Sequence, residues 1–134
     1  MINGINHVTI SVKNIEKAFF FYKEILKLKP VMKSSRSAYF LAGKIWIVLD
    51  KRKTFKECEN YAHISFNVSK KLYKTFITEI KKNRVKEWHK NETEGDSLYI
   101  LDNSGNKLEI HCSTLENRIK HGKTYYDKDT EWYV

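Results

Sequence analysis

One segment of the chain occurs twice, and this repeat restricts the fold more than any other feature. Residues 5–12 read INHVTISV and residues 61–68 read YAHISFNV, so that the third place of each copy is a histidine, His7 or His63. Alternating apolar and polar residues with many β-branched side chains predict a strand for both copies. The repeat therefore indicates two similar units that share one core.

The segments that follow the two strands also correspond. Apolar residues recur at helical spacing after a favourable N-cap, which predicts helices over residues 15–28 and 70–83. Each helix leads into a predicted hairpin, over residues 39–49 and 99–110. The expected pattern is thus βαβββ, written twice.

This pattern predicts an α+β fold. The chain of 134 residues is long enough for one domain, and its 41% of hydrophobic residues suffices for a core. We assign the first βαβββ module to residues 1–57, and the second module with the C-terminal segment to residues 58–126.

Charge and composition limit the partners. Lys and Arg number 25 against 16 Asp and Glu, a net charge of +9 that favours an anionic partner, although a Lys-rich surface of the host's proteins explains the excess equally well. No nucleic-acid-binding motif is present, and no apolar stretch is long enough to span a membrane. Two cysteines form no disulfide framework and no signal peptide is visible, so a cytoplasmic location is expected.

Two histidines and one carboxylate are candidate metal ligands. A histidine on a strand is more often a structural residue, but His7 and His63 hold equivalent places in the repeat, which would turn both rings toward one cavity. Aligning the two hairpins on their turn glycines places Trp46 opposite Glu109. His7, His63 and Glu109 would then bind Mn(II), Fe(II), Zn(II) or Ni(II) and leave positions for a substrate. His111, on the same strand face as Glu109, is a rival ligand.

A polar loop precedes the last hairpin. Its hydroxyls, carboxylates and glycine are suited to a hard cation, although a solvated turn is the commoner explanation of such a loop. Scattered side chains nearby are candidate anion binders, with surface solvation as the alternative. The loop residues are Thr93, Glu94, Gly95 and Ser97, and the anion-binding candidates are Tyr61, His89, Lys90, Tyr99 and Arg118.

These segments, in this order, resemble the fosfomycin-resistance thiol transferases of the vicinal-oxygen-chelate superfamily, whose fold is that of glyoxalases and bleomycin-resistance proteins. The similarity extends from residue 1 to about residue 126 and includes Glu87-Trp88 and the run from Lys107 to His111. The run from Glu94 to Tyr99 and the segment around Arg118 are most similar to the glutathione-using branch.

The resemblance implies an enzyme that adds a low-molecular-weight thiol to the oxirane ring of fosfomycin. It further implies a domain-swapped homodimer, in which His7 of one chain and His63 with Glu109 of the other bind Mn(II), with Zn(II), Ni(II) or Mg(II) as alternatives. The loop would bind K⁺ through Thr93, Glu94, Gly95 and Ser97.

The resemblance also implies roles for single residues. Thr9 would donate a hydrogen bond to the oxirane oxygen, Tyr99 and Arg118 would bind the phosphonate, and Trp46 would form a wall of the site. The lysine that contacts the phosphonate in the glutathione-using branch is replaced by His89, so that either His89 or the next residue, Lys90, makes that contact.

Several alternatives remain open at this point. The thiol is glutathione, bacillithiol or L-cysteine. A non-catalytic drug-binding protein, a hydrolase, a glyoxalase or a dioxygenase would share the fold. The hydrolase branch carries a glutamate just before the strand of Tyr39, whereas residues 34–38 here read SSRSA, which disfavours hydration.

Overall fold

The computed structural model describes residues 1–134. Its first four strands form one sheet in the order β1-β4-β3-β2, with β1 parallel to β4 and the other pairs antiparallel. The elements of this half are β1 (His7–Val12), α1 (Ile15–Phe20), a π-helical turn η1 (Phe21–Ile25), β2 (Lys29–Lys33), β3 (Ser37–Ala42) and β4 (Ile45–Lys51).

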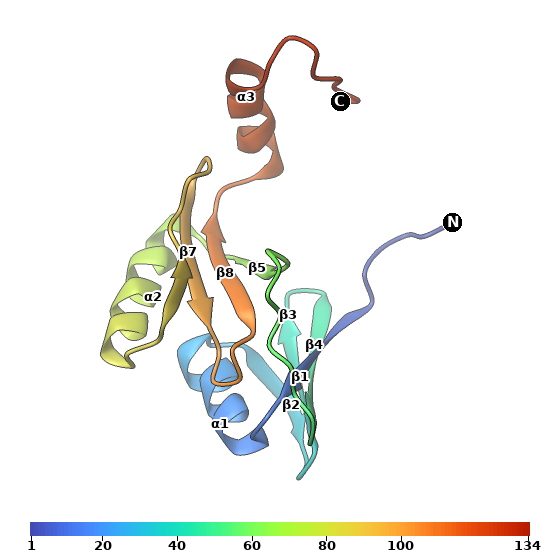
Figure 1. The fold of residues 1–134 in the computed structure, drawn as a ribbon, viewed down its shortest axis with the longest axis vertical. Helices are drawn as coiled ribbons and strands as arrows, with labels where there is room; N and C mark the ends of the chain where they lie inside the picture. The colour runs from blue at the N-terminus through green and yellow to red at the C-terminus, as the bar shows by residue number, and fades with distance from the viewer.

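The second half repeats this arrangement in the order β5-β8-β7-β6, so the prediction of two tandem βαβββ modules is confirmed. A third helix, α3, was not predicted, and Figure 1 shows it extending past the end of β8, away from both sheets. The elements are β5 (Ile64–Asn67), α2 (Lys70–Lys82), β6 (Glu87–His89), β7 (Asp96–Leu101), β8 (Lys107–Cys112) and α3 (Leu115–Tyr125). No helix combines the length and the apolar character that crossing a bilayer requires.

The first predicted helix ends earlier than its apolar pattern suggests. The Asn14 side chain caps its start by accepting from the backbone N–H of Lys17 at 3.0 Å. The helix is α-helical to Phe20 and continues as η1 only to Ile25. Lys27 then adopts a φ of 58°, a left-handed conformation that no helix continues through.

The two modules share one core of 16 buried residues, to which both sheets, α1, η1 and α2 contribute. Side chains alternate between the two faces of a strand. In β1, buried Ile10 faces the core, so His7 and Thr9 lie on the opposite face. In β8, Glu109 and His111 likewise alternate with core residues. Each sheet thus carries its predicted functional residues on the face away from the core.

The expected equivalence of Trp46 and Glu109 is wrong. The β1–β4 register pairs His7 with Trp46 and Thr9 with Val48, whereas the β5–β8 register pairs Ser65 with Glu109. Because Ser65 corresponds to Thr9, the counterpart of Glu109 is Val48. The two hairpins differ in loop length, with residues 43–44 between β3 and β4 but residues 102–106 between β7 and β8, so alignment on turn glycines shifts the register. An apolar residue therefore occupies the place of a fourth ligand.

The turn between β7 and β8 joins the second module to the first. Its buried Asp102 accepts a hydrogen bond from the Tyr22 hydroxyl at 2.9 Å and from the backbone N–H groups of Ser104 and Asn106 at 2.8 and 2.9 Å. The Asn106 side chain donates in turn to the Ser11 carbonyl at 2.9 Å. Burial, followed by the charge of Asp102, raises the pKa of the Tyr22 hydroxyl well above its usual value, so Tyr22 stays a donor.

Asp102→Ala is expected to lower the free energy of unfolding by about 3 kcal/mol, because several buried donors lose their acceptor at once. Denaturant unfolding followed by circular dichroism measures the effect. Asn103→Ala, an exposed position in the same turn, is the matched control and should change stability by less than about 0.5 kcal/mol. Equal unfolding midpoints for the two variants would contradict the role of Asp102.

Candidate metal and substrate site

His63 and Glu109 converge on one point. His63, which precedes β5, has its Nε2 at 3.1 Å from Oε2 of Glu109 in β8, and its Nδ1 at 2.8 Å from the Tyr61 carbonyl oxygen. A carbonyl oxygen only accepts, so Nδ1 carries a hydrogen and Nε2 is the ring nitrogen that faces Glu109. In the hydrogen-bonded pair Nε2 donates to the carboxylate, and a metal ion that binds there takes the place of that proton. The pair therefore has the donor arrangement of a cation site.

The second oxygen of Glu109 is held by a serine and a histidine. Oε1 accepts from the Ser97 hydroxyl at 2.5 Å, and that hydroxyl lies 2.6 Å from Nδ1 of His111. Burial raises the pKa of the Glu109 carboxyl. Hydrogen bonds from Ser97, Ser65 and His63 and the charge of His111 lower it by more, so the pKa lies below its usual value. Glu109 is therefore ionised at neutral pH, the form that binds a metal.

His7 lies on the other sheet. Its Nδ1 is 2.7 Å from Oδ1 of Asn6, and its ring centroid is 4.9 Å from that of Trp46. A single chain brings no three His, Cys, Asp or Glu side chains together in a metal-binding arrangement. The structure thus brings His63 and Glu109 together, with His111 behind them, but leaves His7 apart.

An aromatic wall adjoins the His63–Glu109 pair. The ring centroid of His89 lies 4.9 Å from that of Tyr99 and 5.3 Å from that of Tyr61, and His63 lies 5.7 Å from Tyr99. Trp88, which sequence reasoning did not select, completes this wall at 5.4 Å from Tyr99.

His89 and Lys90 differ in their positions relative to this wall. The β6–β7 register pairs His89 with Tyr99, whereas Lys90 is exposed beyond the end of β6. Burial is the largest cause of the raised pKa of the Tyr99 hydroxyl, which is therefore a donor at neutral pH. Among the candidate anion binders, Tyr61, His89 and Tyr99 are brought together, whereas Lys90 is not.

The predicted cation loop is closed by residues that the prediction omitted. The Asn91 side chain donates to the Gly95 carbonyl at 2.7 Å and accepts from the Thr93 backbone N–H at 3.0 Å. Gly95 has a φ of 85°, and a Cβ there would lie 2.6 Å from the Cβ of Ser113, so only glycine fits. Asn before a turn is a recognisable signal, whereas nothing in the sequence marks Ser113.

Arg118 joins helix α3 to this loop. Its Nε lies 3.7 Å from Oε2 of Glu94, and its Nη2 lies 3.5 Å from the Thr93 hydroxyl. Ser113 donates to both carboxylate oxygens of Glu94, at 2.8 and 2.9 Å. The predicted loop and the predicted Arg118 thus form one connected cluster.

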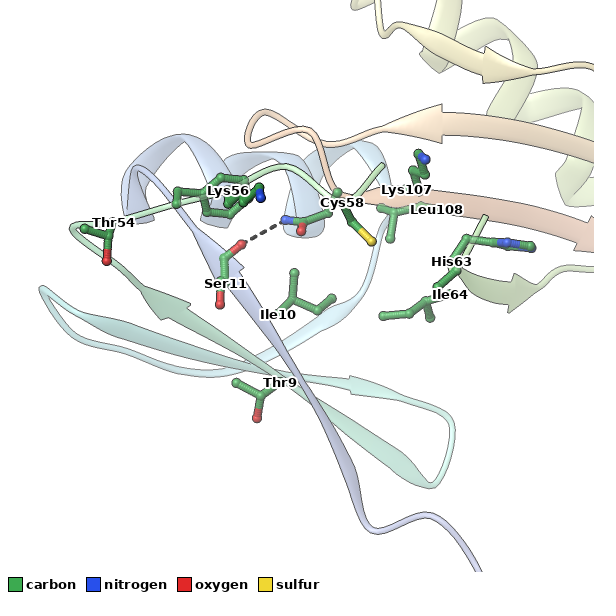
Figure 2. Close-up of a pocket in the computed structure, with 13 residues that line it drawn as sticks. Thr9, Ile10, Ser11, Thr54, Lys56, Cys58, His63, Ile64, Lys107 and Leu108 are labelled. Atoms are coloured by element: carbon green, nitrogen blue, oxygen red, sulfur yellow. Dashed lines mark hydrogen bonds between the residues drawn. The ribbon is translucent and has the colours of Figure 1, made fainter. Parts of the chain in front are cut away.

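A cleft of about 410 Å³ lies between the modules. Figure 2 shows that Thr9 points to the opposite side of β1 from Ile10, with its hydroxyl directed away from His63. Thr9 therefore shares the open face of the first sheet with His7, and its hydroxyl does not point toward His63 of its own chain. The cleft is lined, among others, by Thr9, Ser11, Lys56, Cys58, His63 and Lys107.

Comparison with known proteins identifies the family. The profile of the glyoxalase/bleomycin resistance protein/dioxygenase superfamily matches residues 4–110. The chain belongs to this superfamily. Within it, the chain is 37% identical over 134 residues to the metallothiol transferase FosB of Staphylococcus haemolyticus, covering 92% of this chain and 93% of that protein. It is 29% identical over 123 residues to the glutathione transferase FosA of Serratia marcescens, covering 89% and 87%.

Solved structures place this superfamily member among the fosfomycin-resistance proteins. The FosX protein of Mesorhizobium loti superposes with a TM-score of 0.76 at 26% identity, covering 89% of this chain and 99% of that one. A variant of FosX from Listeria monocytogenes, complexed with Mn(II) and dihydroxypropylphosphonic acid, gives 0.77 at 29% identity, covering 94% and 100%. The Staphylococcus haemolyticus relative is named a metallothiol transferase and the Listeria structure holds Mn(II), and the imidazole of His63 beside an ionised carboxylate fits a divalent metal.

Proposed function

We propose that this protein is a metal-dependent thiol transferase that inactivates fosfomycin by adding a low-molecular-weight thiol to its oxirane ring. The observation that carries the proposal is the His63–Glu109 pair, in which an imidazole nitrogen and a carboxylate oxygen lie 3.1 Å apart next to a wall of candidate anion-binding side chains. The similarity to a metallothiol transferase over nearly the whole chain supports it.

His7, His63 and Glu109 are proposed to hold Mn(II), with Zn(II), Ni(II) or Mg(II) as alternatives. The metal, when bound, would act as a Lewis acid that weakens the oxirane C–O bond. Because His7 lies on a separate sheet from the other two, the proposal includes a homodimer in which each site takes His7 from one chain and His63 with Glu109 from the other. The open faces of the two sheets would then meet across the dimer.

The remaining residues bind and orient the substrate. Arg118, His89 and Tyr99 are proposed to bind the phosphonate, and the loop of Thr93, Glu94, Gly95 and Ser97 to bind K⁺. Trp46 and Tyr61 would enclose the substrate, with Lys90 at the outer edge. A buried phosphonate requires several close donors and positive charges, which this set offers.

Thr9 is proposed to assist the breaking of the oxirane ring. The thiolate sulfur forms a bond to an oxirane carbon as the C–O bond opposite to it breaks. The leaving oxygen takes a proton through the Thr9 hydroxyl, which exchanges it with solvent. The thiolate comes from the co-substrate, so the protein itself needs no nucleophile.

Hydration of fosfomycin is the second candidate, since FosX proteins share the fold and one holds a diol. Water requires a general base near neutral pH, whereas a thiol already has a thiolate fraction. The segment before β3 offers no carboxylate, and its Ser34 hydroxyl is engaged by the backbone N–H groups of Arg36 and Ser37 at 3.2 and 3.0 Å. Thiol addition is therefore favoured.

The test is a ³¹P NMR assay of fosfomycin with purified protein, Mn(II) and K⁺ and with glutathione, bacillithiol, L-cysteine or no thiol. We expect a thiol adduct in at least one tube, faster formation with K⁺ than with Na⁺, and no product without thiol. A diol in the tube without thiol would assign the protein as a hydrolase. Fosfomycin that is bound but unchanged in every tube would assign it as a drug-binding protein.

A further inference from the structure

Asn6 lies between His7 and Trp46 and contacts both. Its Oδ1 is 2.7 Å from Nδ1 of His7 and 3.3 Å from Nε1 of Trp46. An indole N–H only donates, so the Asn6 atom facing it is the amide oxygen. The same oxygen then accepts from His7, which places the ring hydrogen on Nδ1 and leaves the Nε2 lone pair free.

This tautomer is not the one that a free side chain prefers, because neutral histidine in water carries its hydrogen mainly on Nε2. The contact with Asn6 therefore selects the less populated form. A nitrogen that carries hydrogen cannot bind a metal, so this selection decides whether Nε2 is available.

The second module also places a hydrogen on Nδ1 of its histidine, by a different device. Nδ1 of His63 donates to the backbone carbonyl of Tyr61 at 2.8 Å, and the residue in the place of Asn6 is Ala62. The two copies of the repeat thus present the same ring nitrogen, one through a side chain and the other through the backbone. Only the first copy can be disturbed by a side-chain substitution.

The contact with Trp46 extends the role of Asn6 beyond His7. His7 and Trp46 are paired across β1 and β4, and their rings are 4.9 Å apart. Trp46 also packs edge-on against Tyr39 at 4.8 Å. One amide oxygen therefore orients both the His7 ring and the Trp46 ring beside it.

We propose that Asn6 is a positioning residue that selects the Nδ1–H tautomer of His7, presents Nε2 to the metal and anchors the Trp46 indole. The inference rests on the proposed function in one respect, that His7 is a metal ligand. Asn6 and His7 are both exposed in the single chain, so the contact serves the site and not the core.

The test compares three variants of the full chain. Asn6→Leu removes the acceptor with little change in size, Asn6→Asp keeps an acceptor oxygen in place, and Asn3→Leu is the control in the same exposed segment. Long-range ¹H–¹⁵N NMR of the metal-free protein, at a pH where imidazoles are neutral, identifies the protonated nitrogen of His7. The His63 signals, held by the backbone, are the internal control.

We expect Nδ1–H at His7 in the wild type, Asn6→Asp and Asn3→Leu, and a shift to Nε2–H in Asn6→Leu alone. Mn(II) affinity, measured by electron paramagnetic resonance titration, should fall about 10- to 100-fold in Asn6→Leu. It should be kept in Asn6→Asp. If Asn6→Leu fails to fold, the comparison is made with Asn6→Ala.

The outcomes separate the two proposals. An unchanged His7 tautomer in Asn6→Leu, or unchanged Mn(II) affinity despite a changed tautomer, overturns the role of Asn6. A wild-type protein that binds no Mn(II) overturns the metal-dependent function instead, and the tautomer measurement then still decides whether Asn6 selects the His7 nitrogen.

Discussion

Replacing Glu109 by alanine is expected to abolish Mn(II) binding and thiol transfer together. Glu109 is the one anionic member of the proposed ligand set, and its depressed pKa keeps it ionised. Without it, the His63 ring faces no carboxylate and the cation loses its only countercharge among the ligands. Loss of an outer-shell partner already costs about 10- to 100-fold in metal affinity, so loss of this ligand should cost more than about 100-fold.

Electron paramagnetic resonance of Mn(II) titrated into the variant measures the loss, and the ³¹P assay measures turnover. Glu109→Gln is the matched control, because it keeps the size and an acceptor oxygen for Ser97 but removes the charge. It should fold like the wild type and still bind Mn(II) poorly. If Glu109→Ala kept wild-type affinity while His111→Ala lost it, His111 would be the third ligand in place of Glu109.

The repeat predicted the architecture because its signals are local. Alternation and a cap such as Asn14 depend only on neighbouring residues, and two equivalent strands must bury their apolar faces in the same way. The apolar pattern overestimated the length of the first helix, because apolar spacing does not reveal the left-handed conformation of Lys27, which prevents the helix from continuing.

The residue pattern also located half of the candidate site. His63 and Glu109 meet because their strands are neighbours in one parallel pair. His7 does not join them, because β1 belongs to the other sheet. Periodicity within a chain carries no information about which sheet faces which, and in this case only the family resemblance suggested that the two halves of a site come from different chains.

Residues that act by single hydrogen bonds escaped sequence reasoning. Asn6, Asn91 and Ser113 have no periodic pattern, and each acts through the position of one or two atoms. Loop length was equally hard to foresee. Because the β7–β8 turn is longer than the β3–β4 turn, the residue of the first module that corresponds to Glu109 is Val48 and not Trp46. Such details depend on register and side-chain geometry, which only coordinates supply.

Mixing two inactive variants, His7→Ala and Glu109→Ala, is expected to restore thiol transfer. In the proposed homodimer each site combines His7 of one chain with His63 and Glu109 of the other. A mixed dimer then contains one site with all three ligands intact and one site that lacks two of them. Random pairing makes about half of the dimers mixed, so the mixture should recover about a quarter of wild-type activity.

The control mixture combines His63→Ala with Glu109→Ala. These two residues come from the same chain of every site, since they lie 3.1 Å apart within one module. Each site of that mixed dimer therefore lacks one ligand, and no activity should return. Dissociation and reassociation of the purified variants, followed by the ³¹P assay, compares the two mixtures at equal protein concentration. Recovery in neither mixture would mean that each chain builds its own site, whereas recovery in the first alone requires His7 to act across the dimer.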